Sequence, residues 1–393
     1  MKDFTYSMPV EIVFGRGGEN TVGEKIKEYG GSRVLIHYGG ASAKKSGLLD
    51  RVKLSLEKSG LYYVELGGVK PNPRLSLSRE GIALCKKEKI DFILAIGGGS
   101  VIDSAKCIAI GAEYDGDVWD YYSKPMPAPE KAVPLCTILT IAASGSESDN
   151  GSVMTDDTND HKIGYSCEKM FPKFSVLNPE LTFTLPAWQT AAGATDMIAH
   201  VLGSYINHQW DNELAHNLIE ATIKTVLKNG PIAVKEPDNY EARANLMLAS
   251  TACCNGSHTL GCYADGTSHV IEHELSALYD ITHGAGLAVV IPGWFKYMVK
   301  ETPLRFAQMA HRIFGVEFDG EDLVGTALKG IEKFEQWLTS IGMPTRLSQL
   351  GIDDSRFEEM AQRIEKDYGD CGYYSDIRKF TPEDTVNILR LCL

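Results

Sequence analysis

The sequence predicts a two-domain protein: an N-terminal α/β domain with a doubly wound parallel sheet, followed by an all-helical domain. The chain has 393 residues, which is long for a single hydrophobic core. Its first half alternates β-rich runs with amphipathic stretches, whereas apolar residues recur every three to four positions after about Leu185. We therefore expect domains at 1–185 and 186–393, with Pro186 marking the boundary.

Four β-rich runs predict the strands of the first domain. Helical patterns at 47–60 and 74–90 separate the first three of them. Because strand and helix alternate at this spacing, the strands should be parallel, with crossover helices on both faces of the sheet. The runs are SRVLIHYGG (32–40), LYYVELGG (61–68), IDFILAIGGGS (90–100) and AVPLCTILT (132–140).

The second half reads as helix throughout. Three stretches show clear helical spacing, at 212–230, 240–254 and 323–342. Strand signals are few after Pro186. The pattern indicates a helical domain.

Composition limits the classes of partner. Hydrophobic residues make up 44% and charged residues 23%, as in globular proteins that fold in water. A formal charge of −13 argues against nucleic acid and anionic membranes as partners. The N-terminus has no apolar signal core, and the nine cysteines show no CxxC, so we expect a cytoplasmic protein with reduced thiols.

A triple glycine follows the third expected strand, in AIGGGSVIDSAK (95–106). Glycines let the backbone approach a pyrophosphate, and the next helix offers free N–H groups and the positive end of its dipole. The stretch fits neither GxGxxG nor a Walker loop, so a plain strand–helix turn is the alternative. The ligand candidates are Gly97, Gly98, Gly99, Ser100 and Asp103, the last of which could instead only cap the helix.

A second glycine turn, at Gly39 and Gly40, ends the first strand. Ser42 follows it, and these three residues would lie beside a bound adenosine. No acidic residue follows to bind a ribose 2′-hydroxyl, whereas Ser42, Lys44 and Lys45 could bind a 2′-phosphate. The alternative for the lysines is a solvated helix start.

Small hydroxylated residues follow the fourth strand, in TILTIAASGSES (137–148). Thr140, Ser144 and Ser146 could bind phosphate or an amide. An ordinary small-residue turn is the alternative.

Two histidine-bearing segments of the second half suggest a metal site. Asp196 and His200 are four residues apart in GATDMIAH, as are His269 and His273, so each pair shares a helix face. His283 precedes a glycine. One carboxylate and three imidazoles suit Zn²⁺ or Fe²⁺, and spacing alone favours His269 and His273 as a ligand pair. The alternative is surface ion pairs and core histidines.

Several motifs in order resemble the iron-dependent (group III) alcohol dehydrogenases, in particular their butanol-dehydrogenase-like branch. They are YGGASAKKSG, GGVKPNPRLS, GGGSVIDSAK, TIAASGSE, FTLP, GATDMIAH and HVIEHELSALYDITHGAGLA. The resemblance runs nearly end to end. It implies a dinucleotide-binding first domain, a metal-binding helical second domain and a homodimer.

The resemblance also assigns the histidines. It implies that Asp196, His200, His269 and His283 bind the metal and that His273 faces the substrate, unlike the assignment from spacing. A structural imidazole remains the alternative for His273.

For the coenzyme, the resemblance implies NAD or NADP bound at both glycine turns. Beside the residues already named, it adds Asn72 in GGVKPNPRLS and Lys162 in NDHKIGY, and it retains Thr140 and Ser144. The missing acidic residue after the Gly39–Gly40 turn favours NADP at least as much as NAD.

The expected activity is reversible reduction of small aldehydes to primary alcohols such as butanol, with NAD(P)H and Fe²⁺ or Zn²⁺. A dehydroquinate synthase-like lyase would need basic residues for its substrate, and 261–280 contains no Lys or Arg. Glycerol dehydrogenase is a closer alternative that should need a more polar pocket. A non-catalytic metal or nucleotide sensor is a third class, but no segment resembles a DNA-binding or partner domain.

Overall fold

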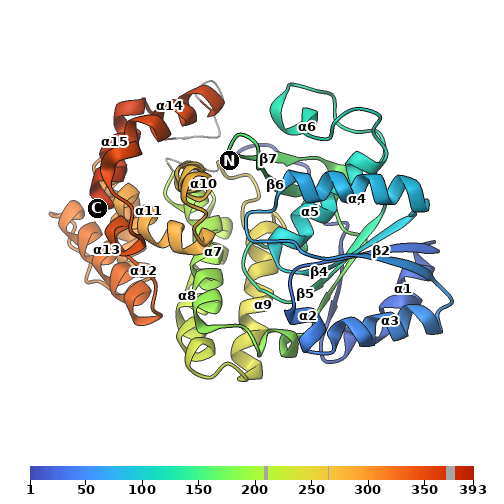
Figure 1. Cartoon of the computed structure of the whole chain (residues 1–393). Helices are drawn as coiled ribbons and strands as arrows, with labels where there is room; N and C mark the ends of the chain where they lie inside the picture. Colours follow the sequence, from blue (N-terminus) through green and yellow to red (C-terminus); the bar gives the residue numbers. More distant parts are fainter. Residues whose placement is uncertain (208–210, 264, 369–376) are drawn as a thin grey trace. The chain divides into compact units, whose positions relative to one another are not determined.

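The computed structural model describes residues 1–207, 211–263, 265–368 and 377–393 (Figure 1). The chain divides into two compact units. One comprises Ser7–Thr184, and the other comprises Met1–Tyr6 with Leu185–Leu393. Each unit is described by itself below.

The Ser7–Thr184 unit, described without gaps, is built on a six-stranded sheet in the order β1-β8-β5-β4-β2-β3. Every neighbouring pair is parallel, which confirms the predicted sheet. The four expected runs form β2, β3, β4 and β5. The strands are β1 (Glu11–Phe14), β2 (Arg33–Tyr38), β3 (Tyr62–Leu66), β4 (Phe92–Gly97), β5 (Leu135–Leu139) and β8 (Phe174–Leu177).

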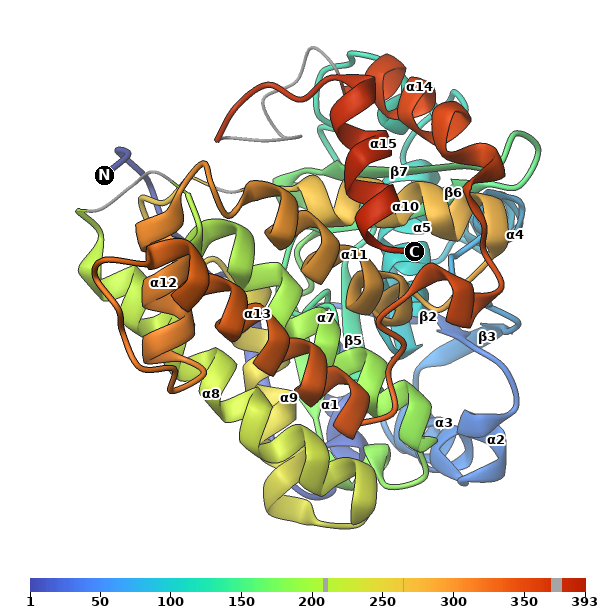
Figure 2. The same cartoon turned by 90° about the vertical axis from the view of Figure 1, so that its left-hand side faces the viewer.

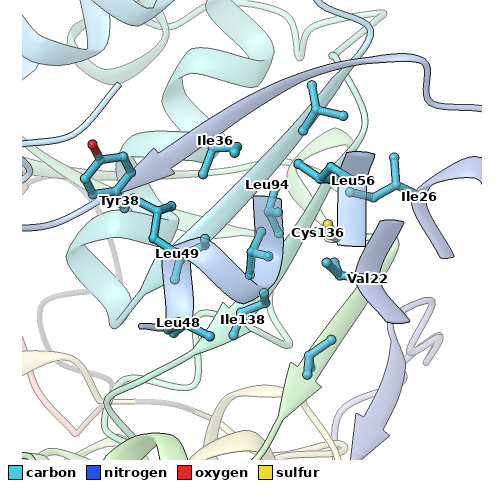
Figure 3. Packing of buried hydrophobic residues seen from close by; sticks show 14 of the residues in the cluster. Val22, Ile26, Ile36, Tyr38, Leu48, Leu49, Leu56, Leu94, Cys136 and Ile138 are labelled. Carbon is cyan, nitrogen blue, oxygen red and sulfur yellow. The ribbon is translucent and has the colours of Figure 1, made fainter. Parts of the chain in front are cut away.

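Helices cover both faces of this sheet. On one face lie α1 (Val22–Glu28) and α3 (Leu48–Lys58), and on the other lie α4 (Leu75–Glu88) and α5 (Gly99–Ala112). Figure 3 shows the first face, where Leu49 and Leu56 of α3 and Ile26 of α1 pack near Leu94 and Ile138 of the central strands. Both strands of that pair are fully buried, as expected for a sheet covered on two sides.

A two-stranded antiparallel hairpin, β6 (Gly151–Asp156) and β7 (His161–Ser166), was not predicted. Its sequence, GSVMTDDTNDHKIGYS, is too polar to show a strand pattern. It is held against α5 and the aromatic residues of α6 (Asp120–Ser123), where the hydroxyls of Tyr122 and Ser152 share a hydrogen bond of 2.8 Å. Tertiary contacts therefore fix this hairpin.

The first six residues, which the sequence analysis placed in the N-terminal domain, belong to the helical unit. The Lys2 amide donates to the Gly261 carbonyl at 3.0 Å, and the Lys2 ammonium lies 3.6 Å from the centre of the Tyr263 ring. These contacts attach the segment to a part of the chain about 260 residues away. A hydrophobicity pattern holds no information about such a contact.

The second unit is helical throughout its described residues, with no strand among them. Figures 1 and 2 show α7, α10 and α11 side by side within it. None of the helices described is both long and apolar enough to cross a bilayer. The helices are α7 (Ala187–Tyr205), α8 (Glu213–Lys235), α9 (Tyr240–Cys254), α10 (Thr267–Tyr279), α11 (His283–Met298), α12 (Pro303–Arg312), α13 (Leu323–Ser340), α14 (Phe357–Tyr368) and α15 (Pro382–Leu391).

The start of α15 is fixed by a capping network around Asp384. Its carboxylate accepts hydrogen bonds from the Thr381 amide at 2.7 Å, from Arg378 at 2.8 Å and from the Tyr297 hydroxyl. These donors hold the pKa of Asp384 well below its ordinary value, although burial opposes them. The network ties α15 to α11.

Candidate active site

The carboxyl ends of the central strands form the candidate coenzyme site of the Ser7–Thr184 unit. From β2 the chain continues outward to β3, whereas from β4 it continues in the opposite direction to β5, so the strand order reverses between β2 and β4. The helices that follow these two strands, α3 and α5, lie on opposite faces of the sheet. Such a switch point leaves a crevice that binds ligands in open α/β sheets. Both predicted glycine turns, Gly39–Gly40 and Gly97–Gly99, lie there.

The triple glycine is required by the fold itself. A Cβ at Gly98 would lie 2.8 Å from the Ile141 side chain, and one at Gly99 would lie 2.3 Å from the Ser144 hydroxyl. The start of α5 is thus pressed against the segment after β5, which the Thr140 amide joins to the Gly97 carbonyl at 2.9 Å. The structure therefore brings the predicted residues of two motifs together.

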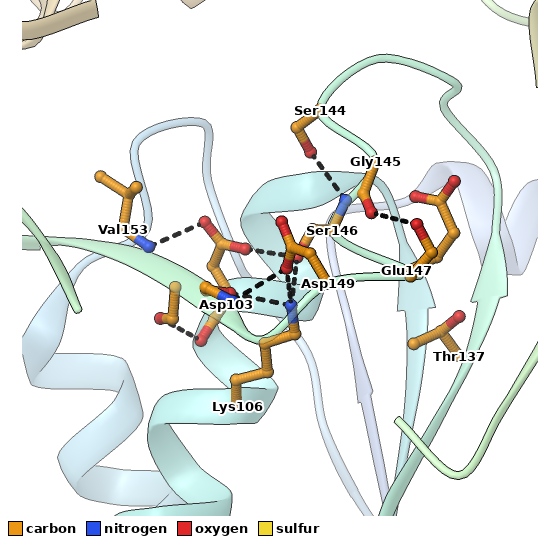
Figure 4. Close-up of polar contacts among 12 residues, drawn as sticks. Asp103, Lys106, Thr137, Ser144, Gly145, Ser146, Glu147, Asp149 and Val153 are labelled. Carbon is orange, nitrogen blue, oxygen red and sulfur yellow. Dashed lines mark hydrogen bonds and ion pairs between the residues drawn. The ribbon is translucent and has the colours of Figure 1, made fainter. Parts of the chain in front are cut away.

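A buried polar network, drawn in Figure 4, continues from there along α5. Asp103 accepts from the Ser146 hydroxyl at 2.6 Å and from the Val153 amide at 3.0 Å. Lys106, whose side chain is fully buried, donates to Ser146 at 3.0 Å, to Asp149 at 2.5 Å and to the Gly151 carbonyl at 2.8 Å. Asp103 and Ser146, which the sequence suggested as coenzyme-binding residues, thus join α5 to the segment after β5 and to β6.

Burial raises the pKa of Asp103 to about 6, although Lys106 and the hydrogen bonds oppose it. Sequence reasoning missed Lys106 and Asp149. Lys106 directly precedes the apolar run CIAIGA of α5, and that was the available signal, because a buried ammonium needs acceptors.

The remaining predicted coenzyme residues lie after β2, after β3 and on the β6–β7 hairpin. Ser42 begins the short helix α2 (Ser42–Lys45) and is exposed, as are Lys44 and Lys45. Asn72 is buried at a positive φ of 53° between β3 and α4. Its neighbour Pro73 accepts from the amide of Thr155, which is paired with Lys162 across the hairpin.

A candidate metal site lies inside the helical unit. Asp196 and His200 are one turn apart on α7, with His200 Nε2 3.2 Å from Asp196 Oδ1. The same carboxylate oxygen lies 4.0 Å from His269 Nε2 of α10 and 3.6 Å from His283 Nε2 at the start of α11. Three helices therefore bring three imidazole nitrogens around one carboxylate oxygen.

Close helix packing places His283. A Cβ at Gly284 would lie 2.1 Å from the Ala192 carbonyl oxygen, so only glycine lets α11 start this close to α7. Gly284, the residue after His283, lies in the first turn of α11. It thereby sets the distance from His283 to Asp196.

The donor set fits a divalent cation. Burial alone would raise the pKa of Asp196, but the facing imidazoles of His200, His283 and His269 outweigh it and hold the pKa well below its ordinary value. Asp196 Oδ1 and His200 Nε2 are buried and make no hydrogen bond of good geometry within the described structure. A cation among these four donors would satisfy atoms that the protein leaves facing one another.

Comparison with known proteins identifies the family. The model of the family described as iron-containing alcohol dehydrogenase matches residues 9–179, and that of the family's C-terminal domain matches residues 190–393. The chain belongs to the iron-containing alcohol dehydrogenase family. As the sequence predicted, it is an NAD(P)-dependent alcohol dehydrogenase, and its branch resembles the butanol dehydrogenases.

Relatives match over the full length. The chain is 40% identical over 393 residues, and all of both chains, to a probable NADH-dependent butanol dehydrogenase 1 of Bacillus subtilis. It is 33% identical over 369 residues, 93% of this chain and 94% of the relative, to the NADPH-dependent aldehyde reductase YqhD of Escherichia coli. The crystal structure of NADH-dependent butanol dehydrogenase A from Thermotoga maritima superposes with a TM-score of 0.95 at 42% identity, covering 100% of this chain and 99% of that one.

In this dehydrogenase, His273 shares His283 as a neighbour with Asp196 but groups with Glu272 instead of Asp196. Donor atoms of His273, His283 and Glu272 all lie within 4.8 Å of one another, and the His273 and His283 ring centres are 5.7 Å apart. Spacing alone paired His269 with His273 as ligands. The geometry instead sets His269 and His283 around Asp196, in line with the resemblance, and the ligand set itself stays a prediction.

Proposed function

We propose that this enzyme reversibly reduces small aldehydes, butanal among them, to primary alcohols, with Asp196, His200, His269 and His283 holding one divalent cation, Fe²⁺ or Zn²⁺. The observation that carries the proposal is the single buried carboxylate oxygen that faces three imidazole nitrogens within 4.0 Å. Residues 261–280 contain neither Lys nor Arg, which disfavours phosphorylated or carboxylated substrates. The names of the relatives, butanol dehydrogenases and an aldehyde reductase, support the same substrate class.

The bound groups would supply the reactive chemistry: a cation here acts as a Lewis acid on a substrate oxygen, and the nicotinamide ring gives or takes the hydride. The protein fixes the donors, since Asp196 is 4% exposed and its helix is buried along most of its length. When an aldehyde is reduced, its oxygen must also gain a proton. We assign that proton to His273, which is 8% exposed and lies next to His283 without belonging to the Asp196 cluster.

The coenzyme proposal covers NADH and NADPH. Exposed Ser42, Lys44 and Lys45 after β2 support a 2′-phosphate, whereas the names of two relatives that are 40% identical, both NADH-dependent butanol dehydrogenases, support NADH. Initial rates with each coenzyme and butanal decide between them. Neutralising both lysines (Lys44→Ala with Lys45→Ala) should raise KM for NADPH about tenfold and leave that for NADH nearly unchanged.

The metal proposal is tested with His200→Ala. We expect the purified variant to lose the bound cation and at least about a thousandfold in kcat/KM for butanal, because the cation stabilises the charge that develops on oxygen. His311→Ala, an exposed histidine on α12 of the same unit, is the matched control and should keep both. Full turnover by enzyme stripped with a chelator, checked by elemental analysis, would refute the proposal.

The assembly proposal is a homodimer, taken from the resemblance. Light scattering of the metal-loaded enzyme should give twice the mass of the 43.1 kDa chain. A mass of one chain across the micromolar range would contradict it.

A further inference from the structure

Glu272 on α10 is a fully buried carboxylate that contacts His283. His283 Nδ1 forms a hydrogen bond with Glu272 Oε2, and the Ser276 hydroxyl donates to Glu272 Oε1. The residue is 0% exposed, and it lies one helical turn before Ser276 on the same helix. A buried carboxylate is costly unless its oxygens accept hydrogen bonds, and here each of them accepts one.

The fold makes room for this carboxylate. A Cβ at Gly286 would lie 2.8 Å from Glu272 Cγ and 2.9 Å from its Oε1. Gly286 therefore provides the space beside α11 in which the Glu272 side chain lies. The Ser276 hydroxyl on the same helix and the glycine on the facing helix together accommodate the buried Glu272 side chain.

The contact fixes the tautomer of His283. A carboxylate oxygen accepts, so Nδ1 carries the hydrogen and Nε2 keeps its lone pair. Nε2 is the atom that faces Asp196 Oδ1, at 3.6 Å. Carboxylates that accept from the outer nitrogen of a metal-binding histidine orient the ring and make the inner nitrogen a stronger donor.

We propose that Glu272 is a positioning residue of the metal centre: it orients His283, sets its tautomer and balances the charge of the cation from outside the ligand set. Together, the carboxylates of Asp196 and Glu272 equal the charge of a divalent ion, so a buried site would carry no net charge when loaded. This inference rests on the proposed ligand set. It adds a residue that neither sequence spacing nor the family motif singled out.

The test measures affinity for Zn²⁺, by competition with a chromophoric chelator, and the visible spectrum of the Co²⁺-loaded enzyme. Glu272→Ala should weaken Zn²⁺ binding about 10- to 100-fold and change the Co²⁺ bands. Glu272→Gln should lose less, about tenfold or under, because its carbonyl oxygen still accepts from Nδ1 without a charge. Ser276→Ala, which removes only the second donor, should give a smaller loss of the same kind.

Glu274→Gln is the matched control. It removes another buried carboxylate of α10, one that pairs with Arg363 at 2.5 Å instead of a histidine. It should keep Zn²⁺ affinity within about twofold, whatever its effect on the melting temperature. A purely structural role for Glu272 would lower the melting temperature and leave the Zn²⁺ affinity and the Co²⁺ spectrum of the folded protein unchanged.

Two outcomes overturn the inference. One is unchanged Zn²⁺ affinity in both Glu272 variants, and the other is binding of two Zn²⁺ per chain with one lost in Glu272→Ala, which would make Glu272 a ligand. Failure of the proposed function is distinguishable, because His283→Ala would then keep its Zn²⁺. If His283→Ala loses the ion while Glu272→Ala binds it normally, only the positioning role is wrong.

Discussion

Replacing Lys106 with methionine removes the ammonium group at the centre of the polar network between α5 and the segment after β5. Methionine has nearly the same length and keeps the buried volume filled, so the loss is that of charge and hydrogen bonds. The ammonium donates to Ser146, Asp149 and the Gly151 carbonyl, and its side chain is fully buried.

The loss of unfolding free energy in Lys106→Met depends on the contacts that Asp149 keeps. Removing one partner of a buried ion pair costs about 3–5 kcal/mol. Asp149 has a side chain that is 24% exposed and still accepts from the Gly151 amide at 3.0 Å, so solvent and this contact offset part of the loss. We expect a decrease of about 2–3 kcal/mol in the free energy of unfolding, which lowers the melting temperature by about 5–10 °C for a unit of this size.

The same substitution should loosen the segment that carries Ser144. Because the Ser144 side chain is packed against Gly99 at the start of α5, we expect KM for the coenzyme to rise about tenfold while kcat falls less. The assays are a thermal melt and initial rates at varied NADH and NADPH.

Lys87→Met is the control, since that side chain is 78% exposed and should change stability by less than about 0.5 kcal/mol. Equal melting temperatures for the two variants, with unchanged coenzyme KM, would refute the assigned role of Lys106.

Three further predictions follow. Gly284→Ala places a Cβ 2.1 Å from the Ala192 carbonyl oxygen and should cost about 2–3 kcal/mol and weaken Zn²⁺ binding, whereas Gly230→Ala, 3.3 Å from its nearest side chain, should be neutral or slightly stabilising in parallel urea titrations. Burial raises the pKa of Glu274 to about 7, above 4.5, so the folded state holds its proton more tightly and stability should fall by about 2–3 kcal/mol between pH 4.5 and 7. Urea midpoints of Glu274→Gln should lack this slope. The pKa of Asp384 is lowered, so its contribution is fully present above its unfolded pKa of about 3.9 and is lost as the pH falls from there through the lower folded pKa. By urea midpoint, Asp384→Asn should therefore cost about 2 kcal/mol at pH 7 and progressively less as the pH falls below about 3.9.

The central strands could be predicted because they are buried on both faces and read as apolar runs. β2, β4 and β5 each lie inside the predicted range, 32–40, 90–100 and 132–140 respectively. Strands β1 and β8 have only four residues each, too few to show a pattern, and β1 is a half-exposed edge strand. The prediction that a helix ends near 230 was also short, because α8 continues through Pro231 to Lys235.

Some residues of the candidate sites could likewise be predicted from the sequence, and others could not. Glycine turns and pairs of metal-binding residues are recognised from residue type and spacing alone, so Gly97–Gly99 and the Asp196–His200 pair could be singled out. Which imidazole faces Asp196 depends on where α11 starts relative to α7, and spacing within one helix does not hold that information. Lys106 and Glu272 were missed for a similar reason, since the partners that justify burying them come from other segments.

The attachment of Met1–Tyr6 to the helical unit has a practical consequence for dissecting the enzyme. The backbone passes from one unit to the other twice, at Tyr6–Ser7 and at Thr184–Leu185. A fragment beginning at Leu185 would therefore lack a strip of its own surface, and a fragment of residues 1–184 would carry six residues with no place to dock. Expressing the halves separately calls for Ser7–Thr184 on one side, and on the other a permuted chain in which the first six residues are joined to the rest of their unit.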